Sequence, residues 1–140
     1  MTYIPEYYTK QNVSFHEYQM HKYIYDLSQS ININVPRIIN YNIESKTLIM
    51  EKINHMNISD YYGENINNID NNIIDKIRDI ITILYDHNIV YPDITGYNFI
   101  EHDGQIWIID FEHASYMTNK KDTFVEEFIN GLHSWNPRFL

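Results

Sequence analysis

Cysteine is absent from this 140-residue chain, so disulfide bonds and cysteine-ligated zinc are both excluded. Glycine is also scarce: the only four glycines are Gly63, Gly96, Gly104 and Gly131. None of them stands in the first 60 residues, so that region contains no glycine-rich phosphate-binding loop. The sequence has no apolar run of the roughly 18 to 20 residues that a membrane-spanning helix needs.

Positive charge is scarce as well, with 10 basic against 19 acidic residues and a formal net charge of −9. Nucleic-acid binding and polybasic membrane binding both need basic patches, so we expect neither kind of partner. The first residues lack the charged and apolar regions of a signal peptide. Heavy use of Ile and Asn is typical of AT-rich genomes, including those of large DNA viruses. We therefore expect a cytoplasmic protein, located in the host cytoplasm if the gene is viral.

Hydrophobic residues make up 44% of the chain, which is enough for the core of one α+β domain. In the first half we predict a strand over residues 3–10, a helix from Ser14 to about Ser28, and strands after Val35 and over 47–53. The S-x-x-E pattern of Ser14 and Glu17 predicts a capping box at the start of the helix.

The second half begins with a polar, Asn-rich segment over 54–72 that includes a short helix near 59–62. A long amphipathic helix follows, because six apolar residues recur at helical spacing: Ile73, Ile74, Ile77, Ile80, Ile81 and Leu84. The Asp103-Gly104 turn predicts a hairpin that pairs 97–101 with 105–111. A second capping box, Thr123 with Glu126, predicts a helix to about Gly131, after which Trp135 and Phe139 should pack back.

Three polar residues surround this hairpin: Asp93, Asn98 five residues later, and Asp110 at the end of the second strand. The hairpin folds Asp110 back toward Asn98, so their oxygens can meet although they are distant in sequence. Hard oxygen ligands of this kind suit Mg²⁺, which often takes only one or two of its ligands from protein. Each residue alone also has a plain structural role, in a turn, a cap or a strand end.

The order of these elements resembles the protein-kinase-like fold. Residues Asp93-Ile-Thr-Gly-Tyr-Asn98 are similar to the catalytic loop D-x-x-x-x-N, and Asp110-Phe111-Glu112 resembles the magnesium motif D-F-G. The resemblance implies ATP and Mg²⁺ as cofactors, Asp93 as the catalytic base, and Asn98 and Asp110 as metal ligands. It also implies one kinase-like domain with a reduced N-lobe over 1–53 and a reduced C-lobe over 54–140.

Upstream positions follow from the same resemblance. Lys10 matches the lysine that grips the nucleotide phosphates, and Glu17 matches its partner on the helix. Glu17 could equally serve only as a capping residue, and Lys10 could be a solvated lysine at a strand end. Glu51 and Ile53 would offer backbone groups to adenine, with Met50 near the purine; the alternative is an ordinary buried strand.

The sequence departs from protein kinases in several places. Tyr91 and Pro92 replace the His and Arg before the catalytic Asp, and Glu112 replaces the Gly of D-F-G. The segment from Ile109 to Glu112, IDFE, instead resembles choline-kinase-type enzymes, and Thr95 resembles the small atypical kinase of the tRNA threonylcarbamoyl machinery. Few residues remain for the substrate-binding helices of a full C-lobe.

We therefore expect an atypical kinase that transfers phosphate from ATP to a protein Ser/Thr or to a small-molecule hydroxyl. The alternative is a pseudokinase-like module that binds a nucleotide or a partner without catalysis. A third possibility is a homo-oligomer whose subunits complete each other's lobes through aromatic residues, with candidates Tyr3, Tyr7, Tyr8, Trp135 and Phe139.

Overall fold

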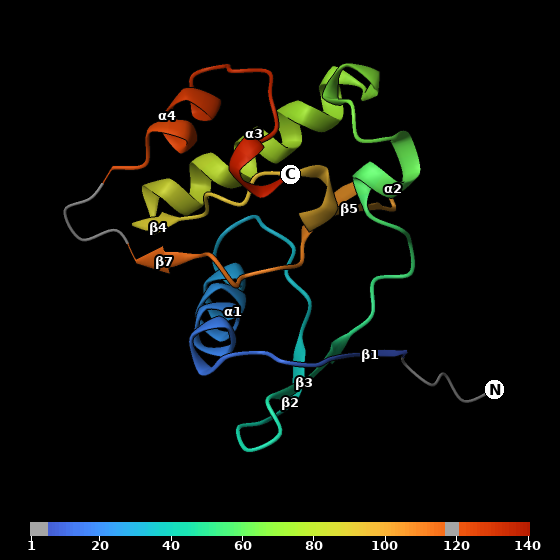
Figure 1. Ribbon diagram of the computed structural model, residues 1–140, viewed down its shortest axis with the longest axis vertical. Coiled ribbons are helices and arrows are strands. Elements are labelled where there is room, and N and C mark those ends of the chain that lie inside the picture. Colours follow the sequence, from blue (N-terminus) through green and yellow to red (C-terminus); the bar gives the residue numbers. More distant parts are fainter. Residues whose placement is uncertain (1–5, 117–120) are drawn as a thin grey trace.

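The computed structural model describes residues 6–116 and 121–140. Its first half is a three-stranded antiparallel sheet with one helix beside it, seen in the lower half of Figure 1. The strands are β1 (Tyr7–Lys10), β2 (Ile38–Asn42) and β3 (Thr47–Glu51), in the order β1-β3-β2, and the helix is α1 (Phe15–Ser28). The predicted order of strand, helix, strand and strand is present, and residues 3–5 of the first predicted strand lie outside the described residues.

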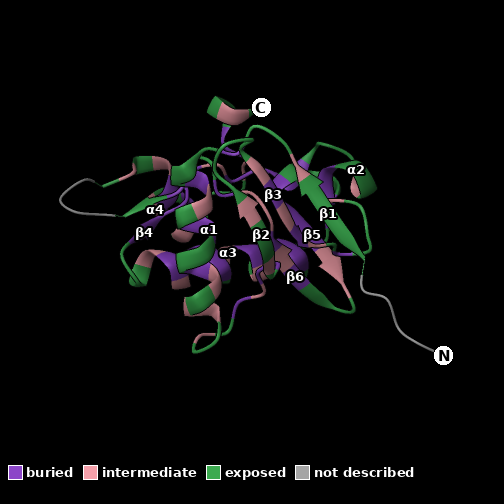
Figure 2. Cartoon of the chain, turned by 90° about the horizontal axis from the view of Figure 1, so that it is seen from below, coloured by how far each residue is buried: buried purple, intermediate pink, exposed green. Residues whose placement is uncertain are grey.

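Strand β1 is an edge of this sheet. It pairs only with β3, where Tyr7 lies opposite Glu51 and Lys10 opposite Leu48. Among the residues that the structure describes, no strand covers its other side. Figure 2 accordingly shows most of β1 coloured as exposed, and only Lys10 is partly buried.

Helix α1 begins as its capping signal predicts, but only half of the predicted box forms. The Ser14 Oγ accepts a 3.1 Å hydrogen bond from the backbone N–H of Glu17, satisfying one of the free donors of the first turn. The Glu17 carboxylate does not return to Ser14. It points to Lys10, because a buried carboxylate gains more from an ammonium group than from a solvated N–H.

The second half is mainly helical. It contains α2 (Ile58–Tyr62), the 3-10 turn η1 (Ile66–Asn68), α3 (Asn71–Asp86), α4 (Thr123–Ile129) and the 3-10 turn η3 (Pro137–Phe139). A hairpin of β5 (Phe99–His102) and β6 (Gln105–Ile108) follows the 3-10 turn η2 (Gly96–Asn98). Strands β4 (Ile89–Val90) and β7 (Ser115–Tyr116) pair as a small two-stranded sheet that local sequence patterns did not predict.

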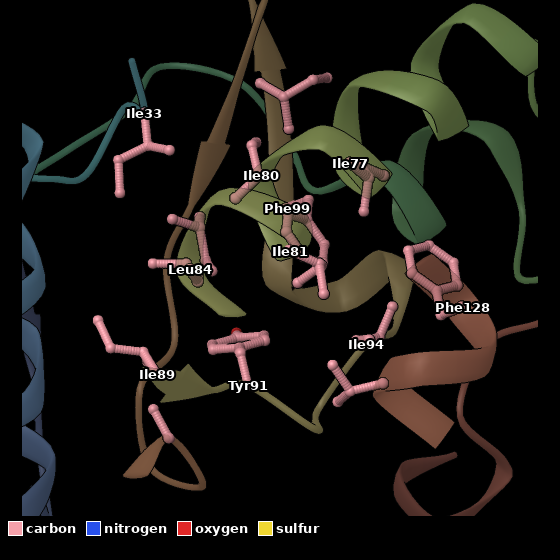
Figure 3. Packing of buried hydrophobic residues seen from close by; sticks show 14 of the residues in the cluster. Ile33, Ile77, Ile80, Ile81, Leu84, Ile89, Tyr91, Ile94, Phe99 and Phe128 are labelled. Carbon is pink, nitrogen blue, oxygen red and sulfur yellow. The ribbon is translucent and has the colours of Figure 1, made fainter. Parts of the chain in front are cut away.

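The predicted apolar face of α3 forms the centre of the core. Its six apolar residues are buried, and Figure 3 shows Ile81 and Leu84 packed close to Tyr91 and Phe99. The loop after β4 is therefore held against α3 by Tyr91 and by Ile94, both of which are almost fully buried. Apolar burial on this scale fixes the position of the polar residues between them.

In the C-terminal region the structure corrects the cap of α4 and the proposed role of Trp135 in oligomers, and it confirms that Trp135 packs back. The cap of α4 is Asp122, whose Oδ1 accepts from the backbone N–H of Val125 at 2.9 Å, so Thr123 is the first residue of the helix. Trp135 is only 3% exposed, and its Nε1 donates to the carbonyl oxygen of Glu64. Trp135 thus belongs to the core of its own chain and offers no surface for a second copy. Within residues 6–116 and 121–140, every helix is too short or too polar to span a lipid bilayer.

Candidate active site

A cavity of about 360 Å³ lies between the small sheet and the hairpin that carries the predicted site. Its walls contain Lys10, Asn98 and Asp110, three of the residues singled out in the sequence. The other lining residues are Tyr8, Met50, Lys52, Ile53, His55, Met56, Asn57, Asp60, Tyr97, Ile100 and Ile109. The fold therefore brings residues from β1, β3, the segment before α2, and the hairpin to one cavity.

Lys10 and Lys52 both line this cavity, and Lys10 is the one that lies beside Glu17 and Asp110. Its Nζ lies 2.6 Å from Oε2 of Glu17 and 3.6 Å from Oδ1 of Asp110. Glu17 therefore receives the capping hydrogen bond through its backbone N–H, while its side chain pairs with Lys10. The role of the pair in nucleotide binding stays a prediction. The short spacing between the two residues suffices because β1 leads almost directly into α1.

The charges around Lys10 are unbalanced, since Glu17, Asp110 and Glu112 bring three carboxylates close together. Burial disfavours the Lys10 ammonium, but Asp110, Glu17 and Glu112 more than offset this cost, so the pKa of Lys10 is raised. Burial also raises the pKa of Glu17, opposed by Lys10 and reinforced by Asp110 and Glu112. The cluster of Lys10 and the three carboxylates therefore carries a net negative charge.

Asp93 and Asn98 are held by one hydrogen bond within their loop. The Asn98 side-chain N–H donates to the carbonyl oxygen of Asp93 at 2.8 Å. The backbone N–H of Ile109 donates to the carbonyl oxygen of Asn98 at 3.1 Å, which fastens the residue before Asp110 to the same loop. The amide nitrogen of Asn98 is thereby engaged, and its side-chain oxygen is the atom left to act as a ligand.

The Asp93 carboxyl does not line the cavity itself, but it lies within electrostatic reach of Asp110. Burial raises the pKa of Asp93, and the neighbouring Asp110 carboxylate raises it further, against His113 and a hydrogen bond from Asn98. A carboxylate with a raised pKa is a better proton acceptor than an ordinary one. Asp93 is thus a partly buried carboxylate whose affinity for a proton is increased by its surroundings.

The donor set suits a hard divalent cation. Oδ1 of Asp110 accepts from the backbone N–H of Glu112 at 3.0 Å, which orients the carboxylate. Ligand oxygens of Glu17, Asp110 and Glu112 lie within 4.8 Å of one another, and Asn98 lines the same cavity as Asp110. The sequence analysis assigned no role to Glu112. The feature that could have indicated one is an acidic residue at the position where kinases have the glycine of D-F-G.

The residues predicted to face adenine are only partly brought to the cavity. Met50 and Ile53 line it, whereas Glu51 does not. The backbone N–H of Glu51 donates to the carbonyl oxygen of Arg37 at 2.8 Å, and its Oε1 accepts from the N–H of Arg37 at 3.0 Å. The N–H and the Oε1 of Glu51 are therefore both used within the sheet, and the adenine contact of this residue stays a prediction.

Two histidines that no sequence pattern singles out, His16 and His21, fasten α1 to the segment around Asp110. The Nε2–H of His16 donates to the carbonyl oxygen of Ala114 at 2.7 Å. The ring of His21 lies 4.7 Å from that of Phe111, centre to centre, and its Nε2–H donates to the carbonyl oxygen of Pro36. These contacts hold Glu17, on the same helix, beside Asp110.

The loop itself is supported from α2 and from the C-terminal segment. A side-chain carbon on Gly96 would lie 2.2 Å from the Oγ of Ser59, so only glycine fits where α2 meets the loop. Asn136 is buried and donates through its side chain to the carbonyl oxygen of Pro92. Short-range patterns in the sequence give no indication of either contact.

Comparison with known proteins shows which other proteins have a similar fold. No curated protein matches the sequence. Among solved structures, the kinase PK-1 of Cydia pomonella granulovirus is similar with a TM-score of 0.58 and 17% identity, over 80% of this chain and 44% of that one. Rv3197 of Mycobacterium tuberculosis, solved as a complex with erythromycin, is similar with a TM-score of 0.54 and 17% identity, over 72% of this chain and 26% of that one.

The chain thus spans less than half the length of either structure, and at this identity the likeness shows the fold alone. The fold is protein-kinase-like and α+β, as the sequence predicted. The RIO domain family matches residues 8–130, from strand β1 to the end of α4. Because that match covers most of the sequence and all of the cavity described above, the chain belongs to the RIO domain family of atypical kinases.

Proposed function

We propose that this protein is an ATP- and Mg²⁺-dependent phosphotransferase that acts on a hydroxyl group. The observation that carries the proposal is the Lys10–Glu17 pair beside Asp110, in one cavity with Asn98. A lysine kept charged by carboxylates suits nucleotide phosphates, while the surplus of carboxylates calls for a divalent cation. Membership of an atypical kinase family supports the same reading.

Each residue would have a separate task. Asp110 and Asn98 would hold Mg²⁺, which would supply positive charge to offset the negative charge of the phosphates. Lys10 would contact the phosphates, kept in place by Glu17. Asp93 would orient the acceptor hydroxyl and take its proton as the oxygen attacks the terminal phosphorus, with ADP leaving. The division into lobes at residue 53 and the cytoplasmic location also remain proposals.

The acceptor is a protein Ser/Thr or a small alcohol. One observation favours the alternative of a nucleotide- or partner-binding module without catalysis. Strand β1 is an edge, and the described residues provide no glycine-rich loop over the phosphates, so water has easier access to the cavity. Homo-oligomerisation through the exposed Tyr7 and Tyr8 remains a further proposal.

Thermal unfolding with ATP tests nucleotide and metal binding together. A ligand at 100 times its Kd stabilises a protein by roughly 2.7 kcal/mol, so we expect ATP to raise Tm by several degrees only when Mg²⁺ is present. Asp110→Asn should remove the Mg²⁺ dependence. Asp103→Asn is the matched control, because Asp103 is exposed at the hairpin turn and asparagine tolerates its positive φ of 52°.

Turnover separates the enzyme from the binding module. Asp93→Asn should abolish phosphate transfer while leaving the ATP-induced rise in Tm largely intact, because the amide keeps the shape but cannot accept the proton. Measurable ATP hydrolysis or transfer in the parent, lost in this variant, would favour catalysis. Absence of any turnover in the parent with a normal rise in Tm would favour the binding module.

A further inference from the structure

Two tyrosines stand side by side on the exposed edge strand β1, and they differ in one respect. Tyr7 is 49% exposed and Tyr8 is 51% exposed, but only Tyr8 lines the cavity. Tyrosine is common in strands, so its presence in β1 alone means little. The position of the Tyr8 ring in the cavity wall is what distinguishes it.

Tyr8 and Lys10 face the same way. Side chains alternate along a strand, so residues two apart share one face and stand about 7 Å apart. Lys10 lies in the same cavity, next to Asp110 at the end proposed for phosphate and metal. Tyr8 therefore lies on the same wall of the cavity as Lys10, two residues before it. We expect the nucleoside part of a nucleotide to lie beside Tyr8 when its phosphates lie beside Lys10.

Two apolar residues from the hairpin region also line the cavity. Ile100 on β5 and Ile109 before Asp110 both line the cavity, and Ile100 is only 8% exposed. These side chains come from the hairpin, whereas Tyr8 comes from the small sheet, and Figure 1 shows β1 and β5 in different halves of the molecule. The cavity thus offers a flat ring aliphatic groups from the hairpin region and a phenol ring from the small sheet.

Aromatic rings bind nucleobases by stacking, because every base presents a π-face. In the described residues Tyr8 takes part in no aromatic pair, and half of its surface is open to a ligand. We propose that Tyr8 stacks on the base of the bound nucleotide and so covers it from the side where β1 has no neighbouring strand. This inference rests on the proposed nucleotide binding and adds the residue that holds the base.

Stacking has a consequence for specificity. A phenol ring discriminates weakly between bases, since it contacts their faces and not their hydrogen-bonding edges. We therefore expect Tyr8 to contribute similarly to the binding of ATP and GTP. Its contribution should vanish for a ligand that carries phosphates but no base.

The test measures the Kd values of Mg²⁺-ATP, Mg²⁺-GTP and Mg²⁺-tripolyphosphate for the full chain by calorimetry. We expect Tyr8→Ala to weaken ATP and GTP about tenfold or more, with tripolyphosphate unchanged, and Tyr8→Phe to bind like the parent. Tyr7→Ala is the matched control: it removes a tyrosine of equal exposure from the same strand outside the cavity, so its affinities should not change. A Tyr8→Trp variant should lose fluorescence on ATP binding, whereas Tyr7→Trp should not.

Three other outcomes would each overturn the inference, and they show whether the role of Tyr8 or the proposed function itself has failed. If the parent binds ATP and Tyr8→Ala binds it equally well, the role of Tyr8 is wrong while the proposed function stands. If Tyr8→Ala loses ATP and tripolyphosphate alike, Tyr8 supports Lys10 and not the base. If the parent binds no nucleotide with Mg²⁺, the proposed function fails and this inference fails with it.

Discussion

The Asn136 side chain donates a 2.8 Å hydrogen bond to the carbonyl oxygen of Pro92, directly before Asp93. The backbone N–H of Asn136 also donates to the carbonyl oxygen of Ile94 at 2.9 Å, so one residue holds both sides of Asp93. Asn136 is 4% exposed, which makes both hydrogen bonds buried. The C-terminal segment therefore fixes the loop on which the proposed catalytic base depends.

The first prediction concerns this contact. Asn136→Ala leaves the Pro92 carbonyl without a buried partner and should lower the free energy of unfolding by about 1–3 kcal/mol. It should also lower turnover more than nucleotide affinity, because the loop positions Asp93, which acts on the acceptor, and does not contact the nucleobase. Denaturant unfolding and kinetics measure the two effects. Asn72→Ala, which changes an exposed asparagine on α3, serves as the control and should change neither.

The second prediction concerns the ion pair of Lys10 and Glu17, in which the Glu17 side chain is 6% exposed. Lys10→Met leaves a buried carboxylate without its partner, so stability should fall by about 1–3 kcal/mol. The double variant Lys10→Met/Glu17→Met should recover part of this loss, because both charges are then removed. Neither variant should bind ATP tightly.

Lys52 provides the comparison for Lys10. Its Nζ lies 3.6 Å from Oε2 of Glu6, but both side chains are largely exposed. Lys52→Met should therefore change stability by no more than about 0.5 kcal/mol. Equal losses for Lys10→Met and Lys52→Met in denaturant unfolding would contradict the structural importance of the Lys10–Glu17 pair.

The third prediction follows from the contact of Gly96 with Ser59. Gly96→Ala should destabilise the protein by about 1–3 kcal/mol, since the new carbon would overlap the Ser59 Oγ. Ser59→Ala alone should be close to neutral, because that buried Oγ has no hydrogen-bond partner among the described residues. The double variant should be more stable than Gly96→Ala. Additive losses would show that the clash is not relieved by removing the hydroxyl.

The fourth prediction concerns pH and His21, which is 1% exposed. Burial lowers the pKa of His21 to about 4 from an ordinary value of 6.5, opposed by its hydrogen bond to Pro36; Lys10 lowers it further and Asp110 raises it. Between these two values the unfolded chain binds more protons than the folded one. The contribution of His21 to stability is therefore complete above pH 6.5 and declines as the pH falls toward 4.

His21→Gln keeps a donor for the Pro36 carbonyl but cannot titrate in this range. Between pH 7 and pH 5 we expect the parent to lose about 2 kcal/mol more than this variant. Denaturant unfolding at both pH values gives the difference. His133→Gln, at an exposed position, should keep the pH dependence of the parent. Parallel losses in the parent and His21→Gln would mean that His21 is not the group that titrates.

Much of the fold follows from local patterns. The stripe from Ile73 to Leu84 predicted α3, the Asp103-Gly104 turn predicted the hairpin, and Ser14 predicted the start of α1. These features depend on residues close in sequence, so the chain alone specifies them. The pairing of β4 with β7 depends on residues 89–90 meeting 115–116, and no short-range pattern records such a pairing.

The sequence by itself determined which chemical groups the site has: two aspartates and an asparagine around a hairpin, and a lysine and a glutamate placed at the start of the chain. Only the tertiary structure decided that Lys10 reaches both Glu17 and Asp110, that Glu112 joins them, and that Tyr8 and not Tyr7 faces the cavity. The physical reason is that periodicity and capping act over a few residues, whereas distances between charges depend on how the core packs the elements that carry them.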